Sequence, residues 1–290
     1  MADAPVRIAS DALTAEIAPW GAELRRLTTA AGEELLWDGD PKWWTGRAPL
    51  LFPIVGALNG GRYRLDGAEH ALPKHGFARR SAFRLVAHDA ASASFRLRDD
   101  ADTRAAFPFA FSLDMAFALS GATLAMTATV ANAGDMPLPF SLGFHPAFRW
   151  PLPGAGAKED HRLVFDRDEP APIRAITADG LIGGTLPSPV AGRTLALRDD
   201  LFAHDALVWD RLESRALRFE GAGDRALDIG FPDTPHLGVW TKPGAGYLCI
   251  EPWQGHADPA GFAGDLRDKP GIVDLAPGAS RSFRMTVTVA

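Results

Sequence analysis

Short apolar runs recur from one end of the chain to the other, and Gly, Pro, Asn and Asp separate them. This pattern is typical of many strands joined by turns. Residues 123–130 show it most clearly, because Leu124, Met126, Ala128 and Val130 alternate with Ala and Thr. Such alternation predicts a strand with one face against a core and the other toward solvent.

A hairpin is predicted at residues 63–72, where Asp66 and Gly67 separate two short strands. An Asp-Gly pair supplies the two positive φ angles of a type I′ turn. Only residues 102–107 indicate a helical turn. We expect further strands at residues 83–87, 94–97, 109–119, 162–165, 194–197, 206–209, 216–219, 226–230, 237–240, 247–251 and 282–289.

These strands follow one another with no spacer long enough for a helix, which disfavours parallel βαβ units. The predicted fold is therefore all-β, a large antiparallel β-sandwich or barrel. No composition break, low-complexity segment or internal repeat divides the chain. We therefore expect residues 1–290 to form a single domain.

The composition is that of an ordinary soluble globular protein, with 47% hydrophobic and 23% charged residues among 290. The longest apolar stretch, residues 49–58, is far shorter than the ~18 residues of a membrane span. The N-terminus lacks the charged segment and apolar core of a signal peptide. These observations predict a cytoplasmic protein with no membrane partner.

Charge and cysteine usage narrow the function further. The net charge is −6, and the only adjacent basic residues are the pairs Arg25-Arg26 and Arg79-Arg80, so a nucleic-acid partner is not expected. The single cysteine, Cys249, excludes an intramolecular disulfide, as is usual in a reducing cytosol. Its apolar neighbours indicate a small buried hydrophobe rather than a nucleophile.

No local motif indicates a metal or a cofactor. The chain has no Cys-x-x-Cys, His-x-x-x-His or Glu-x-x-His spacing, and its glycine clusters lack the context of a phosphate loop or dinucleotide site. It also lacks the Gly-x-Ser-x-Gly of many serine hydrolases. We expect no cofactor and no metal, with a dispersed metal triad of His75, His145 and Glu251 kept as an alternative.

Three segments place a titratable side chain in a turn or at the expected end of a strand, where active sites are commonly built. They are residues 73–79 with His75, 141–148 with His145 before a proline, and 247–253 with Glu251 at the end of an apolar strand. A carboxylate in such surroundings must find a partner or shift its pKa.

The other histidines carry weaker signals. His204 and His236 stay as candidates beside strands, and the solvated surface is expected for His70, His88, His161 and His256. The tryptophans offer flat faces that suit a sugar ring, although core packing explains such residues equally well. Those of interest are Trp37, Trp43, Trp44 and Trp253.

Taken in order, five segments resemble the aldose 1-epimerase (mutarotase) family, and more narrowly its LacX-like branch. They lie at residues 47–56, 74–79, 141–148, 204–209 and 250–255. The resemblance extends over nearly the whole chain. It implies a galactose mutarotase-like β-sandwich with an open cleft that holds a hexose.

The resemblance also implies roles for particular residues. His75, His145 and Glu251 match the catalytic positions of the family, and Arg47, Arg79 and Asp205 match substrate-binding positions, with Asp210 as the alternative to Asp205. Interconversion of α and β anomers needs a base for the C1 hydroxyl and an acid for the ring oxygen, without a cofactor. We expect Glu251 to be the base, His145 the acid and His75 a second donor.

Other functions remain open from the sequence. A mutarotase for hexose 6-phosphates would use Arg62, Arg79 and Arg80. A carbohydrate-binding protein would keep the fold without catalysis, and a metal-dependent lyase or isomerase would use the dispersed triad. The oligomeric state is equally open between a monomer and a homodimer formed through exposed edge strands.

Overall fold

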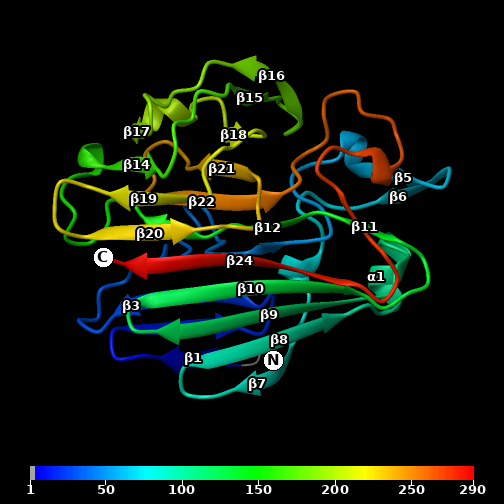
Figure 1. Ribbon diagram of the computed structural model, residues 1–290, viewed down its shortest axis with the longest axis horizontal. Helices are drawn as coiled ribbons and strands as arrows, with labels where there is room; N and C mark the ends of the chain where they lie inside the picture. The colour runs from blue at the N-terminus through cyan, green and yellow to red at the C-terminus, as the bar shows by residue number, and fades with distance from the viewer. Residues whose placement is uncertain (1–3) are drawn as a thin grey trace.

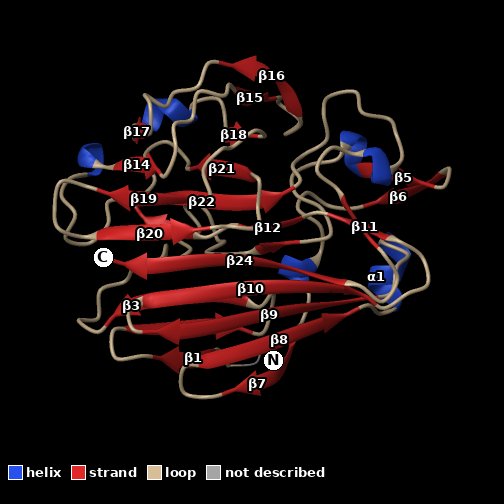
Figure 2. Cartoon of the chain, in the orientation of Figure 1, coloured by secondary structure: helices blue, strands red, loops and turns tan. Residues whose placement is uncertain are grey.

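A nine-stranded and an eight-stranded antiparallel sheet dominate the computed structural model, which describes residues 4–290 (Figures 1 and 2). The nine-stranded sheet has the order β17 (Thr194–Ala196), β14 (Arg162–Phe165), β19 (Ala216–Glu220), β20 (Ala226–Gly230), β24 (Ser280–Val289), β10 (Thr123–Asn132), β9 (Phe111–Ser120), β8 (Ser92–Arg98) and β7 (Arg84–His88). In Figure 1 its longest strands, β24, β10 and β9, cross the middle of the view side by side.

The eight-stranded sheet carries the site described below. Its order is β16 (Ile182–Leu186), β15 (Ile173–Ile176), β18 (Leu207–Trp209), β21 (His236–Trp240), β22 (Tyr247–Gln254), β12 (Leu142–Phe144) and β4 (Leu50–Leu51), and β13 (Ala147–Arg149) also pairs with β22.

Smaller elements complete the structure. The remaining strands are β1 (Val6–Ala9), β2 (Leu13–Ala18) and β3 (Glu23–Thr29) in one sheet, the pair β11 (Leu138–Phe140) and β23 (Val273–Leu275), and the pair β5 (Arg62–Leu65) and β6 (Ala68–Ala71). The helices are α1 (Ala101–Ala106) and five 3-10 turns, at Asn59–Gly61, Ala78–Arg80, Lys158–Asp160, Asp199–Phe202 and Leu266–Asp268. No helix in residues 4–290 is long and apolar enough to span a membrane.

The strand predictions agree with this structure. The buried and half-buried residues of β10 alternate along its whole length, as the sequence pattern predicts. The hairpin β5–β6 turns at Asp66 and Gly67, whose φ values of 50° and 83° fit a type I′ turn. Helix α1 begins after Asp100, whose side chain accepts a hydrogen bond from the Thr103 N–H at 2.8 Å.

The two large sheets share one apolar core. Leu124 and Met126 of β10 belong to the same buried cluster as Leu248 and Ile250 of β22. Each sheet therefore turns one face toward the other, which is the arrangement of a β-sandwich. The predicted all-β fold is confirmed. The eight-stranded sheet has a second face, and the side chains on that face build the site.

Candidate functional site

Strand β22 divides its side chains between the core and the site. Leu248 and Ile250 lie in the sandwich core, so the alternation of a strand places Cys249 and Glu251 on the opposite face. The sequence predicted Glu251 at the end of its strand, and this was wrong, because β22 continues to Gln254. Pro252 is tolerated there because it lies opposite the interruption between β12 and β13.

The same interruption brings His145 to Glu251. Strand β12 pairs with β22 at Trp253, β13 pairs with it at Cys249, and the chain between them passes through His145 and Pro146. The His145 Nε2 atom lies 3.2 Å from Glu251 Oε2. Both side chains are almost completely buried, with 8% and 3% of their surface exposed.

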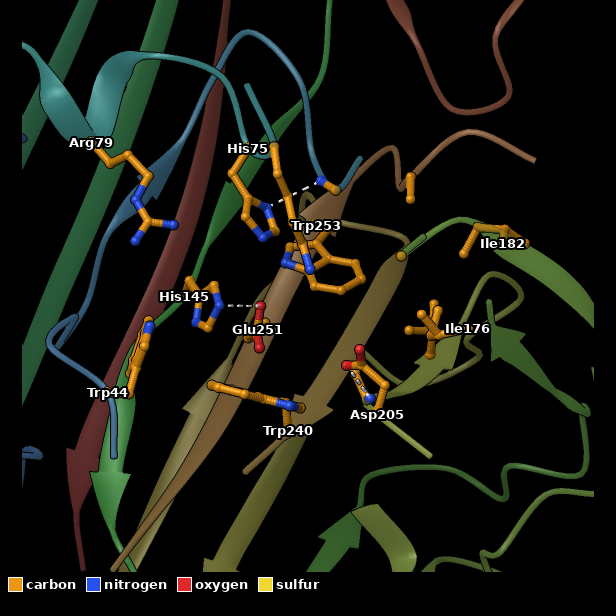
Figure 3. Close-up of a pocket in the computed structure, with 16 residues that line it drawn as sticks. Trp44, His75, Arg79, His145, Ile176, Ile182, Asp205, Trp240, Glu251 and Trp253 are labelled. Atoms are coloured by element: carbon orange, nitrogen blue, oxygen red, sulfur yellow. Dashed lines mark hydrogen bonds and ion pairs between the residues drawn. The ribbon is translucent and has the colours of Figure 1, made fainter. Parts of the chain in front are cut away.

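Aromatic rings fix the orientation of His145. The indole of Trp44 stacks on the imidazole with ring centroids 4.9 Å apart, and Trp240 meets it edge-on at 6.3 Å. The ring of His75 stands at 75° to that of His145, with centroids 5.8 Å apart. Figure 3 shows His75, His145 and Glu251 close together near the middle of the site.

A tight loop holds His75 in place. His75 and Gly76 have φ values of 68° and 70°. A Cβ atom at Gly76 would lie 2.2 Å from the Phe52 carbonyl oxygen, so the close approach of the two segments requires glycine. The Gly56 N–H donates to His75 Nδ1 at 3.1 Å. Because Nδ1 accepts this bond, a neutral His75 carries its proton on Nε2.

These residues line a cavity of about 260 Å³. It contains five of the six site residues expected from the sequence, namely His75, His145, Glu251, Arg79 and Asp205. In Figure 3 Asp205 and Arg79 lie on opposite sides of the central group. The complete lining is Trp44, Gly56, Lys74, His75, Arg79, His145, Ile176, Gly180, Ile182, Asp205, Ala206, Val208, Trp240, Glu251, Trp253 and Ala257.

Arg47, the sixth expected residue, does not line the cavity. Its Nη1 atom donates to the Arg25 carbonyl at 2.8 Å, and its backbone N–H donates to Glu23 at 2.8 Å. Asp210, the alternative to Asp205, is also absent from the lining and pairs with Arg174 at 2.6 Å. Arg47 therefore braces the loop that carries Trp44 instead of reaching into the cavity.

Trp253 forms a flat part of the cavity wall. Its indole lies against two glycines on the neighbouring strands, where a Cβ atom at Gly238 or Gly143 would come within 2.4 or 2.5 Å of the ring. The sequence singled out Trp44 and Trp253, and both line the cavity, whereas Trp37 and Trp43 do not.

Sequence reasoning missed several lining residues. Trp240 is the last residue of strand β21, and Ile176 and Ile182 come from the β15–β16 hairpin, which the pattern did not predict. Lys74 also lines the cavity. Its position directly before His75 was the only feature of the sequence that could have indicated this. The cavity therefore combines a polar side, at His75, His145 and Glu251, with an apolar wall.

Burial shifts the pKa values of the central groups in opposite directions. It lowers the pKa of His145 to about 3, aided by the positive charge of Arg79. Burial raises the pKa of Glu251 well above its ordinary value. It also lowers the pKa of His75, with His145 as the next contribution. His145 and Glu251 thus share one proton over a wide pH range, which suits acid–base chemistry.

One group of side chains in the described part of the chain has the geometry of a metal site. Its ligand atoms come from His145, Cys249 and Glu251 and lie within 4.8 Å of one another. The group differs from the triad that the sequence left open, because Cys249 takes the place of His75. The Nδ1 atom of His75 is already engaged with Gly56.

Comparison with known proteins agrees with this fold. The sequence model of the aldose 1-epimerase family matches residues 6–287, and the chain belongs to that family. It is 29% identical to the chromosomal LacX protein of Lactococcus lactis subsp. lactis over 97% of this chain and 99% of that protein. The family expected from the sequence is therefore confirmed.

Two solved structures share the fold over nearly their whole length. One is a galactose mutarotase related enzyme from Lactobacillus acidophilus, with 30% identity, a TM-score of 0.90, and coverage of 99% of this chain and 97% of that one. The other is a galactose mutarotase-like protein from Lactobacillus casei ATCC 334, with 29% identity, a TM-score of 0.92, and coverage of 99% and 100%. Family and fold together support an isomerase of the sugar epimerase or mutarotase type.

Proposed function

We propose that this protein is a cofactor-independent aldose 1-epimerase that interconverts the α and β anomers of a free hexose. The observation that carries the proposal is the buried contact of His145 with Glu251 at 3.2 Å inside a cavity that a third group, His75, also lines. The cavity volume of about 260 Å³ lies below the roughly 300–1,000 Å³ of drug-sized sites, which favours a monosaccharide.

The proposed reaction moves two protons and opens one bond. Glu251 removes the proton of the C1 hydroxyl while His145 protonates the ring oxygen, and the bond between C1 and the ring oxygen breaks. The open aldehyde rotates about its C1–C2 bond. Ring closure then runs the two transfers in reverse, so that His145 recovers its proton from the ring oxygen and Glu251 returns its own to O1.

The roles require the shared proton of the pair to reside on His145. In the protein alone, burial favours the neutral arrangement with the proton on Glu251. The charges of Lys74 and Arg79 favour the carboxylate but also oppose a protonated His145, so the shift depends on a sugar hydroxyl that donates to Glu251 and stabilises its carboxylate. Substrate binding therefore shifts the proton along the existing 3.2 Å contact without any exchange with solvent.

His75 acts as a fixed donor in this scheme. Its Nδ1 atom accepts from the Gly56 N–H, and burial keeps the ring neutral at physiological pH. The remaining Nε2–H is directed by that bond and donates to the ring oxygen or to a neighbouring hydroxyl. Arg79 and Asp205 are proposed to bind further hydroxyl groups from the two sides of the cavity.

A hexose 6-phosphate is the second candidate substrate. Lys74 and Arg79 both line the cavity and offer positive charge to a phosphate. Arg80 does not line it, and Arg62 lines a separate cavity instead. Two of the three arginines that the sequence suggested for this role are thus absent, which favours the free sugar.

Polarimetry of freshly dissolved sugar tests the proposal. We expect the protein to accelerate the mutarotation of α-D-glucose or α-D-galactose, and Glu251→Gln and His145→Ala each to lower kcat by ~10²–10⁴-fold. His88→Ala, which changes an exposed histidine outside the cavity, is the matched control and should leave the rate unchanged.

The substrate class follows from the same assay. Acceleration with glucose 6-phosphate but not with the free sugars would show that the substrate is a hexose 6-phosphate. No acceleration of any sugar by folded protein, with ligand binding retained, would refute catalysis and leave a carbohydrate-binding protein.

A further inference from the structure

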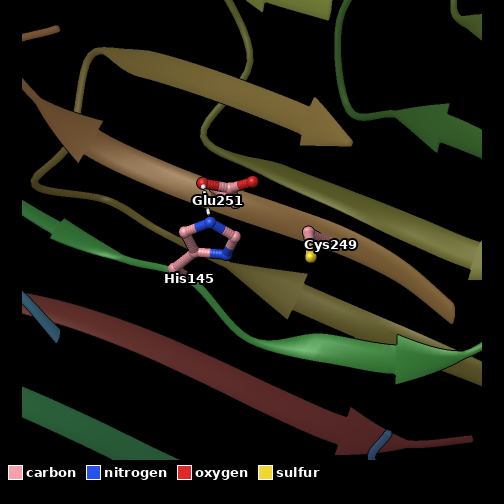
Figure 4. Close-up of side chains that lie close together, drawn as sticks. All are labelled: His145, Cys249 and Glu251. Carbon is pink, nitrogen blue, oxygen red and sulfur yellow. Dashed lines mark ion pairs between the residues drawn. The ribbon is translucent and has the colours of Figure 1, made fainter. Parts of the chain in front are cut away.

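Cys249 is a buried thiol that the proposed sugar chemistry does not use. It lies two residues from Glu251 on the same face of β22 and is completely buried. Figure 4 shows it beside the His145–Glu251 pair, with the second ring nitrogen of His145 turned to the side where Cys249 lies. That nitrogen, Nδ1, is buried and has no hydrogen-bond partner.

The spacing of the three side chains is close to that of a tetrahedral zinc site. Zinc bonds of about 2.0–2.1 Å to nitrogen and oxygen and about 2.3 Å to sulfur place the nitrogen and oxygen about 3.3 Å apart, and the sulfur about 3.6 Å from either. His145 Nε2 and Glu251 Oε2 are 3.2 Å apart. A ring nitrogen of His145, the Cys249 sulfur and a carboxylate oxygen of Glu251 all lie within 4.8 Å of one another. At the 4.8 Å limit the sulfur has to approach by about 1.2 Å, which is within the reach of a side-chain rotation.

The donor set also selects the kind of metal. A thiolate and an imidazole favour zinc and related ions over Mg²⁺ or Ca²⁺, which prefer oxygen ligands. His145 and Glu251 line the cavity, so the fourth position of a tetrahedral ion faces it and is open to water. Because Nδ1 of His145 has no hydrogen-bond partner, no hydrogen bond at that nitrogen is lost when the ring binds the ion.

We propose that His145, Cys249 and Glu251 form a binding site for a zinc-class divalent cation, and that the bound ion inhibits the enzyme. Binding releases the thiol proton and the proton shared by His145 and Glu251, and it adds one water molecule as the fourth ligand. The inhibition rests on the proposed function, because the ion occupies the two groups that exchange protons with the sugar. Metal binding itself does not depend on that function.

Cadmium titration followed by ultraviolet absorbance tests the site directly. A thiolate bound to Cd²⁺ gives a charge-transfer band, and Cys249 is the only cysteine of the chain, so the band reports this site alone. We expect the band to saturate at one ion per chain, and to be absent in Cys249→Ala and Cys249→Ser. The alanine variant avoids burying a hydroxyl group, and a thermal melt verifies that each variant is folded.

Inhibition of mutarotation by zinc is the second test of the site. We expect Zn²⁺ to abolish the activity of the unaltered protein, a chelator to restore it, Mg²⁺ to have no effect, and Cys249→Ala to retain activity in the presence of Zn²⁺. A missing cadmium band, or equal zinc sensitivity in Cys249→Ala, would overturn the metal site while leaving the mutarotase proposal untouched. A protein without mutarotase activity that still shows the band would refute the proposed function alone.

Discussion

Gly238→Ala is predicted to displace the indole of Trp253 from the wall of the cavity. A Cβ atom at Gly238 would lie 2.4 Å from Cη2 and 2.5 Å from Cζ2 of Trp253. Carbon atoms pack at about 3.5–4.0 Å, so the ring has to move by about 1 Å or more. The indole cannot slide along the sheet toward Gly143 either. It already lies so close to that residue that a Cβ atom built there would be 2.5 Å from the ring.

The only relief is a shift of the indole away from the sheet and into the cavity. Overpacking of this kind costs about 1–3 kcal/mol of stability. A displacement of about 1 Å in a positioning group lowers activity by up to ~10²-fold. We therefore expect both a lower free energy of unfolding and a lower kcat/KM in Gly238→Ala, measured by urea denaturation and polarimetry.

Gly184→Ala is the matched control, since Gly184 also lies in a strand of the same sheet but a Cβ atom there would have no neighbour within 4 Å. The stability cost of Gly238→Ala should shrink when Trp253→Leu is present, because the smaller side chain removes the clash. Gly238→Ala that is as stable and as active as Gly184→Ala would show that Trp253 does not depend on the glycine beside it.

Three further predictions concern buried charge. Because the pKa of His145 is lowered to about 3, kcat/KM should stay level as the pH falls through 6.5 and decline only well below it, whereas an acid limb near 6.5 would contradict the shared proton. Because the pKa of Glu251 is raised, the folded state binds more protons than the unfolded state above pH 4.5, and its stability falls as the pH rises. Glu251→Gln removes this effect. The melting temperature of the variant should therefore exceed that of the unaltered protein by a margin that grows from pH 4.5 upward. Lys269 and Asp258 form a buried ion pair at 2.7 Å. Lys269→Met should therefore lower the free energy of unfolding, measured by urea denaturation, by about 3–5 kcal/mol, and adding Asp258→Asn should recover part of that loss. A loss below about 1 kcal/mol would show that water reaches the pair.

Local patterns were enough to predict the strands that alternate cleanly and to select His75, His145 and Glu251, whereas Arg79 and Asp205 came from the family resemblance. The alternation of residues 123–130 identified β10, and the segments around His75, His145 and Glu251 identified the centre of the site. Strand β16 escaped prediction because Gly183 and Gly184 give it no side-chain alternation. The register that places His145 in the gap between β12 and β13 depends on distant pairing, which no local pattern encodes.

Long-range contacts also explain where the structure differs from the expectations. Arg47 was expected at the sugar, but its partners at Glu23 and Arg25 come from a strand that the sequence pattern did not reveal. His161 and His256 were expected on the surface, yet both are buried, with 1% and 5% exposed. His161 accepts from the Leu152 N–H at 3.1 Å, a partner supplied by the fold.

Alternate residues of β22 point to opposite faces of the sheet, so the residues that stabilise the fold and those that line the cavity are different residues of one strand. Leu248 and Ile250 belong to the core between the sheets, while Glu251 and Trp253 line the cavity. A substitution at Trp253 can therefore alter the cavity without changing a side chain of the core between the sheets. Directed evolution of this protein toward a new ligand should therefore vary the cavity-lining positions and keep the core residues of the same strand unchanged.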